Sequence, residues 1–189
     1  MDDRLTSEER SILLKLAREA MQAAVNGKTP PPLLLESLPE KLRERGATFV
    51  TLTCSGDLRG CIGALEPYMP LAEDVREHAV AAALQDYRFP PVQPGELPGI
   101  NIEISRLTQP KNLDYAAPRD LATALRPNID GVILKDGFRR ATFLPQVWEK
   151  LPDPAEFLSH LCLKMGASPD LWMHKKLEVQ IYQVEEFHE

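Results

Sequence analysis

Two runs of β-branched, apolar residues that flank a short turn constrain the fold of this 189-residue chain most strongly. The first run is TFVTLTC at 48–54 and the second is LRGCIGAL at 58–65, with SGD between them. Thr, Val, Ile and Phe favour strands, whereas Ser, Gly and Asp favour turns. The pattern predicts a β-hairpin, so the chain must build at least one antiparallel sheet.

Further strands and several helices are indicated by periodicity. INIEISRL at 100–107 alternates with a period of two, so its isoleucines share one face and Asn101, Glu103 and Ser105 share the other. Asp136-Gly137 between apolar arms predicts a second hairpin. Apolar residues at helical spacing, with capping or proline signals at the segment ends, predict helices. The principal helical segments are 6–25, 70–84 and 153–166.

These elements together predict an α+β fold, in which helices pack on antiparallel sheet. We expect a larger subdomain at approximately 1–109 and 171–189, and a smaller inserted α+β subdomain at approximately 110–170. The larger subdomain would hold the first helix and the strands at 48–54, 58–64, 100–107 and 176–184. The smaller one would form around the second hairpin.

Charge and cysteine content narrow the function classes. The net charge is −6, which disfavours non-specific nucleic-acid binding because that binding rests on Lys and Arg. No run approaches the roughly 18 apolar residues of a membrane span, and MDDRLTSEER is unlike a signal peptide. Cys54, Cys61 and Cys162 are odd in number and fit no zinc spacing. We therefore expect a cytoplasmic protein with free thiols, no metal and no cofactor. No feature indicates an oligomeric state.

LRGCIG at 58–63 is the first candidate site. In a regular strand Arg59 and Cys61 share a face, where a guanidinium would stabilise the thiolate. Gly60 and Gly63 would leave the sulfur uncrowded, and a strand glycine often marks a bulge or the close approach of a ligand. The alternative is that Cys61 packs as a small buried residue and the glycines serve a bulge.

Five other residues carry candidate chemistry. Glu103 is a potential proton acceptor, with a solvated sheet residue as the alternative. Asp86, Arg88 and Phe89 in DYRF could bind an anionic ligand, although an Arg–carboxylate pair more often braces a loop. His78 on the predicted helix 70–84 could pair with Cys61 only if the fold brought the two together.

The ordered motifs resemble the AMMECR family across nearly the whole chain. LRGCIG is the family's hallmark, and DxRFxP is matched by Asp86, Arg88, Phe89 and Pro91. The segments EIS, FLPQVW and FLxxLCxKxG are matched as well, whereas His78 stands where asparagine is common in the family. The resemblance implies a single AMMECR-type domain over 1–189, with larger and smaller subdomains and a cleft that carries the hallmark. It also implies, for prokaryotic members, a system with a Memo-like protein and a radical SAM enzyme.

Two functions therefore stay open. In the first, Cys61 is a nucleophile or carrier thiol, Arg59 and Glu103 assist it, and Gly60, Gly63, Asp86, Arg88 and Phe89 form the binding site for a small anionic substrate. In the second, the chain is a non-catalytic partner or scaffold of the Memo-like and radical SAM proteins. Nucleotide or nucleic-acid binding is a weaker third alternative.

Overall fold

The structure, a computed structural model, describes residues 4–189 and divides into two compact units. The first unit contains the described residues up to Thr108 together with Glu185–Glu189, and the second is Gln109–Val184. Each unit has its own antiparallel sheet and its own hydrophobic core, which confirms the predicted α+β class.

The first unit holds a sheet with the strand order β2-β1-β4-β9, and β3 pairs with the start of β1. Its strands are β1 (Arg45–Cys54), β2 (Asp57–Gly63), β3 (Met69–Pro70), β4 (Ile100–Leu107) and β9 (Val184–His188). Its helices are α1 (Ser7–Val25), α2 (Glu40–Arg43) and α3 (Leu71–Leu84), with 3-10 turns η1 (Leu35–Ser37) and η2 (Pro94–Gly99). The segment between α3 and β4 contains four prolines, at 90, 91, 94 and 98, and its only helical element is the short turn η2.

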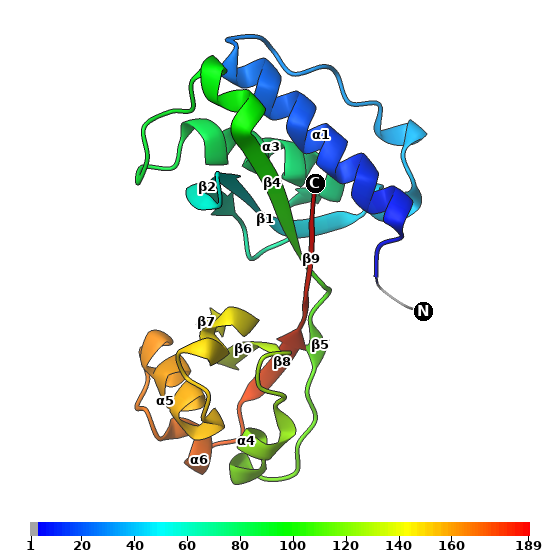
Figure 1. The fold of residues 1–189 in the computed structure, drawn as a ribbon. Coiled ribbons are helices and arrows are strands. Elements are labelled where there is room, and N and C mark those ends of the chain that lie inside the picture. The colour runs from blue at the N-terminus through cyan, green and yellow to red at the C-terminus, as the bar shows by residue number, and fades with distance from the viewer. Residues whose placement is uncertain (1–3) are drawn as a thin grey trace. The chain divides into compact units, whose positions relative to one another are not determined.

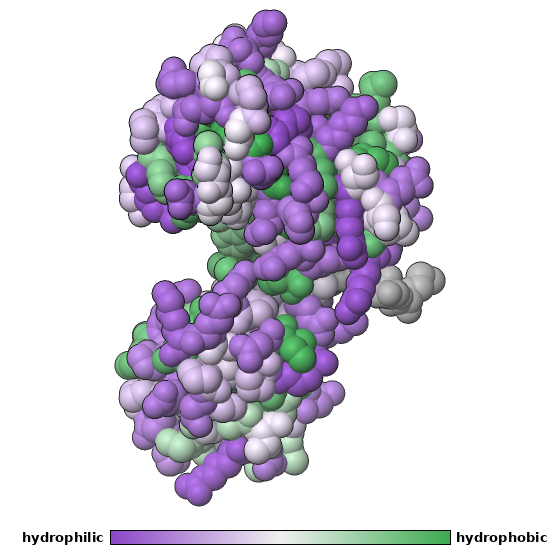
Figure 2. Space-filling view, viewed as in Figure 1, coloured by the Kyte–Doolittle hydropathy of each residue, from purple (hydrophilic) through white to green (hydrophobic). Residues whose placement is uncertain are grey.

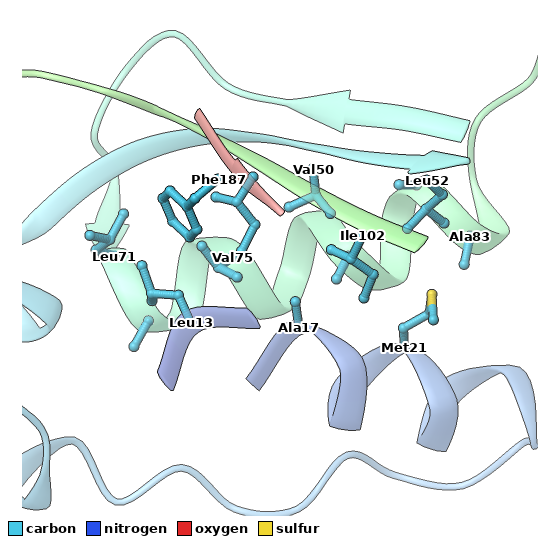
Figure 3. Close-up of a cluster of buried hydrophobic side chains, with 14 of the residues drawn as sticks. Leu13, Ala17, Met21, Val50, Leu52, Leu71, Val75, Ala83, Ile102 and Phe187 are labelled. Carbon is cyan, nitrogen blue, oxygen red and sulfur yellow. The ribbon is translucent and has the colours of Figure 1, made fainter. Parts of the chain in front are cut away.

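Alternation along the strands assigns one face of this sheet to the core. Ile102 and Ile104 of β4 are fully buried, as are Val50 and Leu52 of β1. They meet apolar side chains of α1 and α3 in one cluster (Figure 3). Because these residues lie two apart in each strand, the residues between them point to the opposite face.

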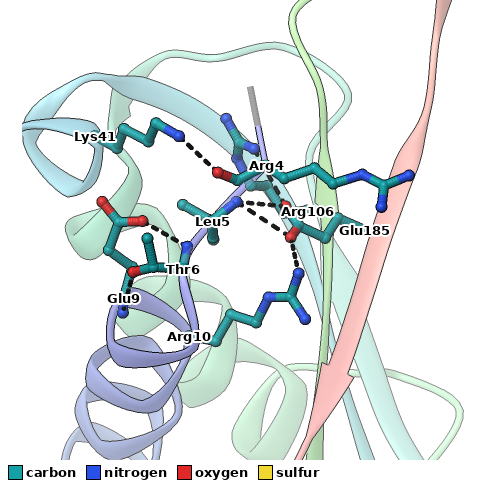
Figure 4. Close-up of polar contacts among 8 residues, drawn as sticks. All are labelled: Arg4, Leu5, Thr6, Glu9, Arg10, Lys41, Arg106 and Glu185. Atoms are coloured by element: carbon teal, nitrogen blue, oxygen red, sulfur yellow. Dashed lines mark hydrogen bonds and ion pairs between the residues drawn. The ribbon is translucent and has the colours of Figure 1, made fainter. Parts of the chain in front are cut away.

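Glu185 of β9 connects the end of the chain to its beginning (Figure 4). Its carboxylate accepts hydrogen bonds from the Leu5 backbone N–H at 3.2 Å and from Arg10, and pairs with Arg106 at 3.3 Å. Leu5 directly precedes Thr6, whose hydroxyl caps α1 in the predicted capping box. The contact fixes the start of α1 against the sheet.

The second unit has a four-stranded sheet with the order β5-β8-β6-β7 (Figure 1). Its strands are β5 (Lys111–Asn112), β6 (Gly131–Asp136), β7 (Arg139–Phe143) and β8 (Glu178–Tyr182). Its helices are α4 (Leu121–Ala124), α5 (Pro154–Lys164) and α6 (Leu171–His174), with 3-10 turns η3 (Pro118–Asp120) and η4 (Pro145–Glu149). The predicted hairpin is present as β6–β7, with Gly137 at φ +62° in its turn.

The final predicted strand, 176–184, is wrongly placed by the sequence pattern. Its main part is β8, which pairs with β6 and β5 in the second unit and not with the sheet of the first. The chain then returns to the first unit as β9. Strand pairing here depends on contacts between residues far apart in the sequence, which local periodicity does not encode.

Hydrophilic side chains dominate the face of the molecule drawn in Figure 2, with apolar residues scattered among them. Among the helices of residues 4–189, none has the length and apolar character that crossing a membrane requires.

Candidate functional site

A bulge in β2 sets the direction of the Cys61 side chain. The hairpin turn pairs Cys54 with Asp57, and Ser55 and Gly56 adopt positive φ values of 52° and 88° between them. Continuing this register without interruption would place Cys61 opposite Val50, on the core face. The register instead shifts between Leu52 and Thr53, so Cys61 pairs with Thr51. The extra residue therefore turns Cys61 away from the core.

The face of the sheet turned away from α1 and α3 is called the outer face here. Across the three strands β2, β1 and β4, Cys61, Thr51 and Glu103 form one row on it. All three are half-buried. Neighbouring strands are about 4.8 Å apart, so Glu103 lies two strand spacings, about 10 Å, from Cys61 across Thr51. The structure thus places two predicted site residues in one row.

Thr51 is a site residue that the sequence interpretation missed. Its hydroxyl donates a hydrogen bond to Cys61 Sγ at 3.2 Å. A hydrogen bond to sulfur favours the thiolate over the thiol. The only sequence signal for Thr51 is its position in the predicted hairpin. A regular hairpin counted from the turn pairs Thr51 with Gly60, and only the bulge moves its partner to Cys61.

Arg59 is the extra residue of the bulge, and the structure does not place it with Cys61. Its guanidinium forms two hydrogen bonds with Glu96 of η2, at 2.7 Å and 3.1 Å. This pairing raises the pKa of Arg59 and lowers that of Glu96. The expected common face of Arg59 and Cys61 is therefore corrected, because a bulge interrupts the alternation that the expectation assumed. The arginine that contacts Cys61 is Arg88, which donates a hydrogen bond to the Cys61 carbonyl at 3.2 Å.

Asp86 and Arg88 hold the backbone of Cys61. The Asp86 carboxylate, only 4% exposed as a residue, accepts the Cys61 N–H at 2.9 Å. Arg88 donates to the Cys61 carbonyl at 3.2 Å and to both oxygens of Asp86, at 2.9 Å and 2.7 Å. β2 is an edge strand, so these contacts replace the neighbouring strand that Cys61 lacks.

This backbone arrangement explains the contact of Cys61 with Thr51. Because the Cys61 N–H and carbonyl point outward to Asp86 and Arg88, Cys61 and Thr51 form a non-hydrogen-bonded pair of the antiparallel ladder. In such pairs the side chains approach more closely than in hydrogen-bonded pairs. The hydroxyl can therefore reach the sulfur.

The Asp86–Arg88 pair is held in its charged form. The hydrogen bonds from Arg88 are the largest cause of a pKa of Asp86 well below its usual range, and the Cys61 N–H contributes to it. Burial opposes this shift but is the smaller effect. Asp86 in turn raises the pKa of Arg88. The Arg88 guanidinium also lies 5.5 Å from the ring centre of half-buried Phe89.

The two glycines of LRGCIG serve packing. A Cβ at Gly60 would lie 2.1 Å from the carbonyl oxygen of Ala82 in α3, so only glycine permits this close approach. A Cβ at Gly63 would lie 2.3 Å from the carbonyl oxygen of Thr48 and 2.5 Å from the Phe49 ring. The expectation that the glycines leave the sulfur open is corrected, because both spaces are occupied.

His78 lies on α3, on the other side of the sheet from the Cys61 side chain. Its Nδ1 is 3.2 Å from the buried carboxylate of Asp74, which also accepts a 2.6 Å hydrogen bond from the Thr48 hydroxyl. This arrangement excludes a Cys61–His78 pair. Among residues 4–189, no three His, Cys, Asp or Glu side chains are grouped to hold a metal ion.

The other two cysteines, Cys54 and Cys162, can be compared with Cys61 in their burial. Cys54 ends β1 and is half-buried, as Cys61 is. Cys162 lies in α5 and is fully buried, and this burial raises the pKa of its thiol. All three cysteines are free.

The fold defines a class of small α+β protein in which a helix-covered antiparallel sheet holds a cysteine in a bulged edge strand. The chain belongs to the AMMECR1 family, whose sequence pattern matches residues 14–187. A protein of Methanothermobacter thermautotrophicus is 40% identical over 186 residues, covering 98% of this chain and 96% of that protein. Protein MJ0810 of Methanocaldococcus jannaschii is 38% identical over 192 residues, covering 98% and 92%.

The fold is also similar to a solved structure. The crystal structure of the uncharacterized protein PH0010 from Pyrococcus horikoshii matches with a TM-score of 0.76 and 33% sequence identity. The match covers 98% of this chain and 93% of that chain.

Proposed function

We propose that this AMMECR1-family protein uses Cys61 as a reactive thiol that bonds covalently to a substrate or carried group. The observation that supports this most directly is the hydrogen bond from the Thr51 hydroxyl to Cys61 Sγ at 3.2 Å. The backbone of the same residue is held by Asp86 and Arg88. A nucleophile needs such fixed geometry and a stabilised thiolate.

Three side chains would assist the thiol. Thr51 stabilises the thiolate. Glu103 lies in the same row, too far from the thiol for direct proton transfer, and would contact a bound substrate. Arg88 binds an anionic group of the substrate through Nη1, which has no hydrogen-bond partner among residues 4–189. Arg59 does not act on the sulfur, because Glu96 holds it.

Alkylation with two reagents of equal size tests this function. Iodoacetate carries a negative charge and iodoacetamide does not, and peptide mass spectrometry locates the adduct. We expect both to modify Cys61, and the ratio of the iodoacetate rate to the iodoacetamide rate to be higher at Cys61 than at Cys54. An unmodified Cys61 in the folded protein would refute the proposal, and an equal ratio would refute the role of Arg88. The Cys61→Ser protein is the control for assignment of the adduct.

A non-catalytic partner function is the second candidate, and exposed apolar side chains favour it. Leu58 is 44% exposed, Leu65 38% and Tyr68 69%, and all three lie in or just after β2. Such residues are frequent in protein interfaces. The partners would be the Memo-like protein and the radical SAM enzyme that the family resemblance implies. Size-exclusion chromatography of this chain with each partner, repeated with Tyr68→Ser, tests this. The partner function predicts a complex that the substitution weakens and that Cys61→Ser leaves intact.

A further inference from the structure

The surroundings of Cys61 bear on the kind of carbon that its thiol can attack. A thiolate that attacks a carbonyl carbon creates an oxyanion on the neighbouring oxygen. Acyl-transfer sites stabilise that oxyanion with backbone N–H groups or side-chain donors aimed at it. A displacement at saturated carbon creates no such oxyanion. The donors around Cys61 therefore distinguish the two reaction classes.

The backbone donors next to the sulfur are already occupied. The Cys61 N–H donates to Asp86 Oδ2 at 2.9 Å. Gly60 and Ile62, on either side of Cys61, face Leu52 and Val50 in the hydrogen-bonded pairs of the β1–β2 ladder. Their N–H groups therefore point to β1 and away from a ligand on the outer face.

The side chains near the sulfur give no better place for an oxyanion. The Thr51 hydroxyl donates its proton to Cys61 Sγ. The position beside the Cys61 N–H, where an oxyanion would otherwise bind, is occupied by the buried carboxylate of Asp86. An oxyanion at this position would be repelled by the carboxylate, and the ion pair with Arg88 weakens this repulsion without removing it. Arg88 holds this carboxylate and the Cys61 carbonyl through Nε and Nη2, and its Nη1 is assigned to the anionic group of the substrate, so no Arg88 donor is left for the reacting oxygen.

We infer that Cys61 reacts with saturated carbon by displacement and not with acyl groups, an inference that rests on the proposed function. The Cys61 thiolate attacks the carbon and forms a C–S bond. The bond from that carbon to the leaving group breaks, and the leaving group departs with the bonding electrons. The thiol ionises before the attack, and its proton passes to solvent. The substrate class is an activated alkyl compound, and the product is a Cys61 thioether.

Two neutral probes that differ in their electrophilic carbon test the inference. Iodoacetamide offers a saturated carbon and p-nitrophenyl acetate an acyl carbon. The rates at Cys61 are measured by peptide mass spectrometry in a Cys54→Ser variant, and the ratio of alkylation to acylation is compared with that of free N-acetylcysteine. We expect the ratio at Cys61 to be higher by about tenfold or more. An equal or lower ratio overturns the inference while leaving the reactive thiol intact. Failure of both reactions overturns the proposed function itself.

Asp86→Asn provides a matched variant. It keeps an oxygen that can accept the Cys61 N–H and removes the negative charge. We expect the ratio to fall towards that of N-acetylcysteine, because acylation is no longer opposed by the carboxylate. A folded Asp86→Asn protein with the wild-type ratio would contradict the electrostatic account. If this variant does not fold, the comparison of the wild-type site with N-acetylcysteine still decides the inference.

Discussion

At the residue scale, the site depends on which side chains face Cys61 Sγ. The thiol receives a hydrogen bond from Thr51, and its backbone is bound by Asp86 and Arg88. The residue types of LRGCIG and DYRF pointed to Cys61, Asp86 and Arg88. They could not identify Thr51, because its role follows from a one-residue shift in strand register. The same shift separates Arg59 from the thiol.

Replacing Thr51 by valine removes the hydroxyl and keeps the β-branched shape that suits a strand. We expect iodoacetamide to modify Cys61 about 2- to 10-fold more slowly at pH 7, since the thiolate loses one hydrogen bond. Thr51→Ser retains a hydroxyl and should react at close to the wild-type rate. Unchanged alkylation in a folded Thr51→Val protein would contradict the role of the hydroxyl.

Asp86 links the site to the pH dependence of stability. Its pKa is lower in the folded protein than in the unfolded chain, so its contribution to stability is present above the unfolded value of about 3.9. That contribution is lost as the pH falls below this value. The free energy of unfolding, measured with urea at pH 7 and pH 3, should therefore fall more between these two pH values for the wild type than for Asp86→Asn. Equal losses in the two proteins would show that Asp86 is not stabilised by folding.

At the element scale, the hairpin β1–β2 could be predicted, whereas its bulge could not. β-branched residues and the SGD turn define the two strands. Whether one residue is inserted in the ladder depends on packing against α3 and on the contact of Arg59 with Glu96, which join distant segments. The alternation of β4 was predicted correctly because no bulge interrupts its pairing with β1.

Gly60 tests the packing of β2 on α3. Gly60→Ala would place a Cβ 2.1 Å from the backbone oxygen of Ala82, which cannot move without shifting the helix. We expect a loss of about 1–3 kcal/mol in the free energy of unfolding, measured with urea. Gly95→Ala is the matched control, because a Cβ there meets nothing within 4 Å, and it should change stability by less than about 0.5 kcal/mol. Similar values for both variants would contradict the close approach.

At the scale of the whole molecule, two units with separate cores make up the chain. The sequence predicted an α+β protein with a larger and a smaller part. It could not assign the segment after α6, because β8 and β9 follow each other directly and belong to different sheets. Both strands are short and mix apolar with polar residues, so pattern alone does not distinguish their partners.

We expect the second unit to unfold while the first unit stays folded, because each has its own core. Trp148 and Phe157 are fully buried, with ring centres 3.7 Å apart. Phe157→Ala should destabilise that unit by about 3–5 kcal/mol. Hydrogen exchange followed by mass spectrometry should then show lost protection in β6, β7 and α5 and retained protection in β1 and β4. Equal loss in both units would show that they unfold together.

The central claim, that folding makes Cys61 a reactive thiol, is tested most directly by comparing the three cysteines in folded and urea-unfolded protein. Iodoacetamide rates at Cys54, Cys61 and Cys162 are measured at pH 7 by peptide mass spectrometry. We expect folding to slow alkylation of Cys162 most, to slow that of Cys54, and to leave Cys61 the fastest of the three. If Cys61 in the folded protein reacts no faster than Cys54, folding does not make Cys61 a reactive thiol.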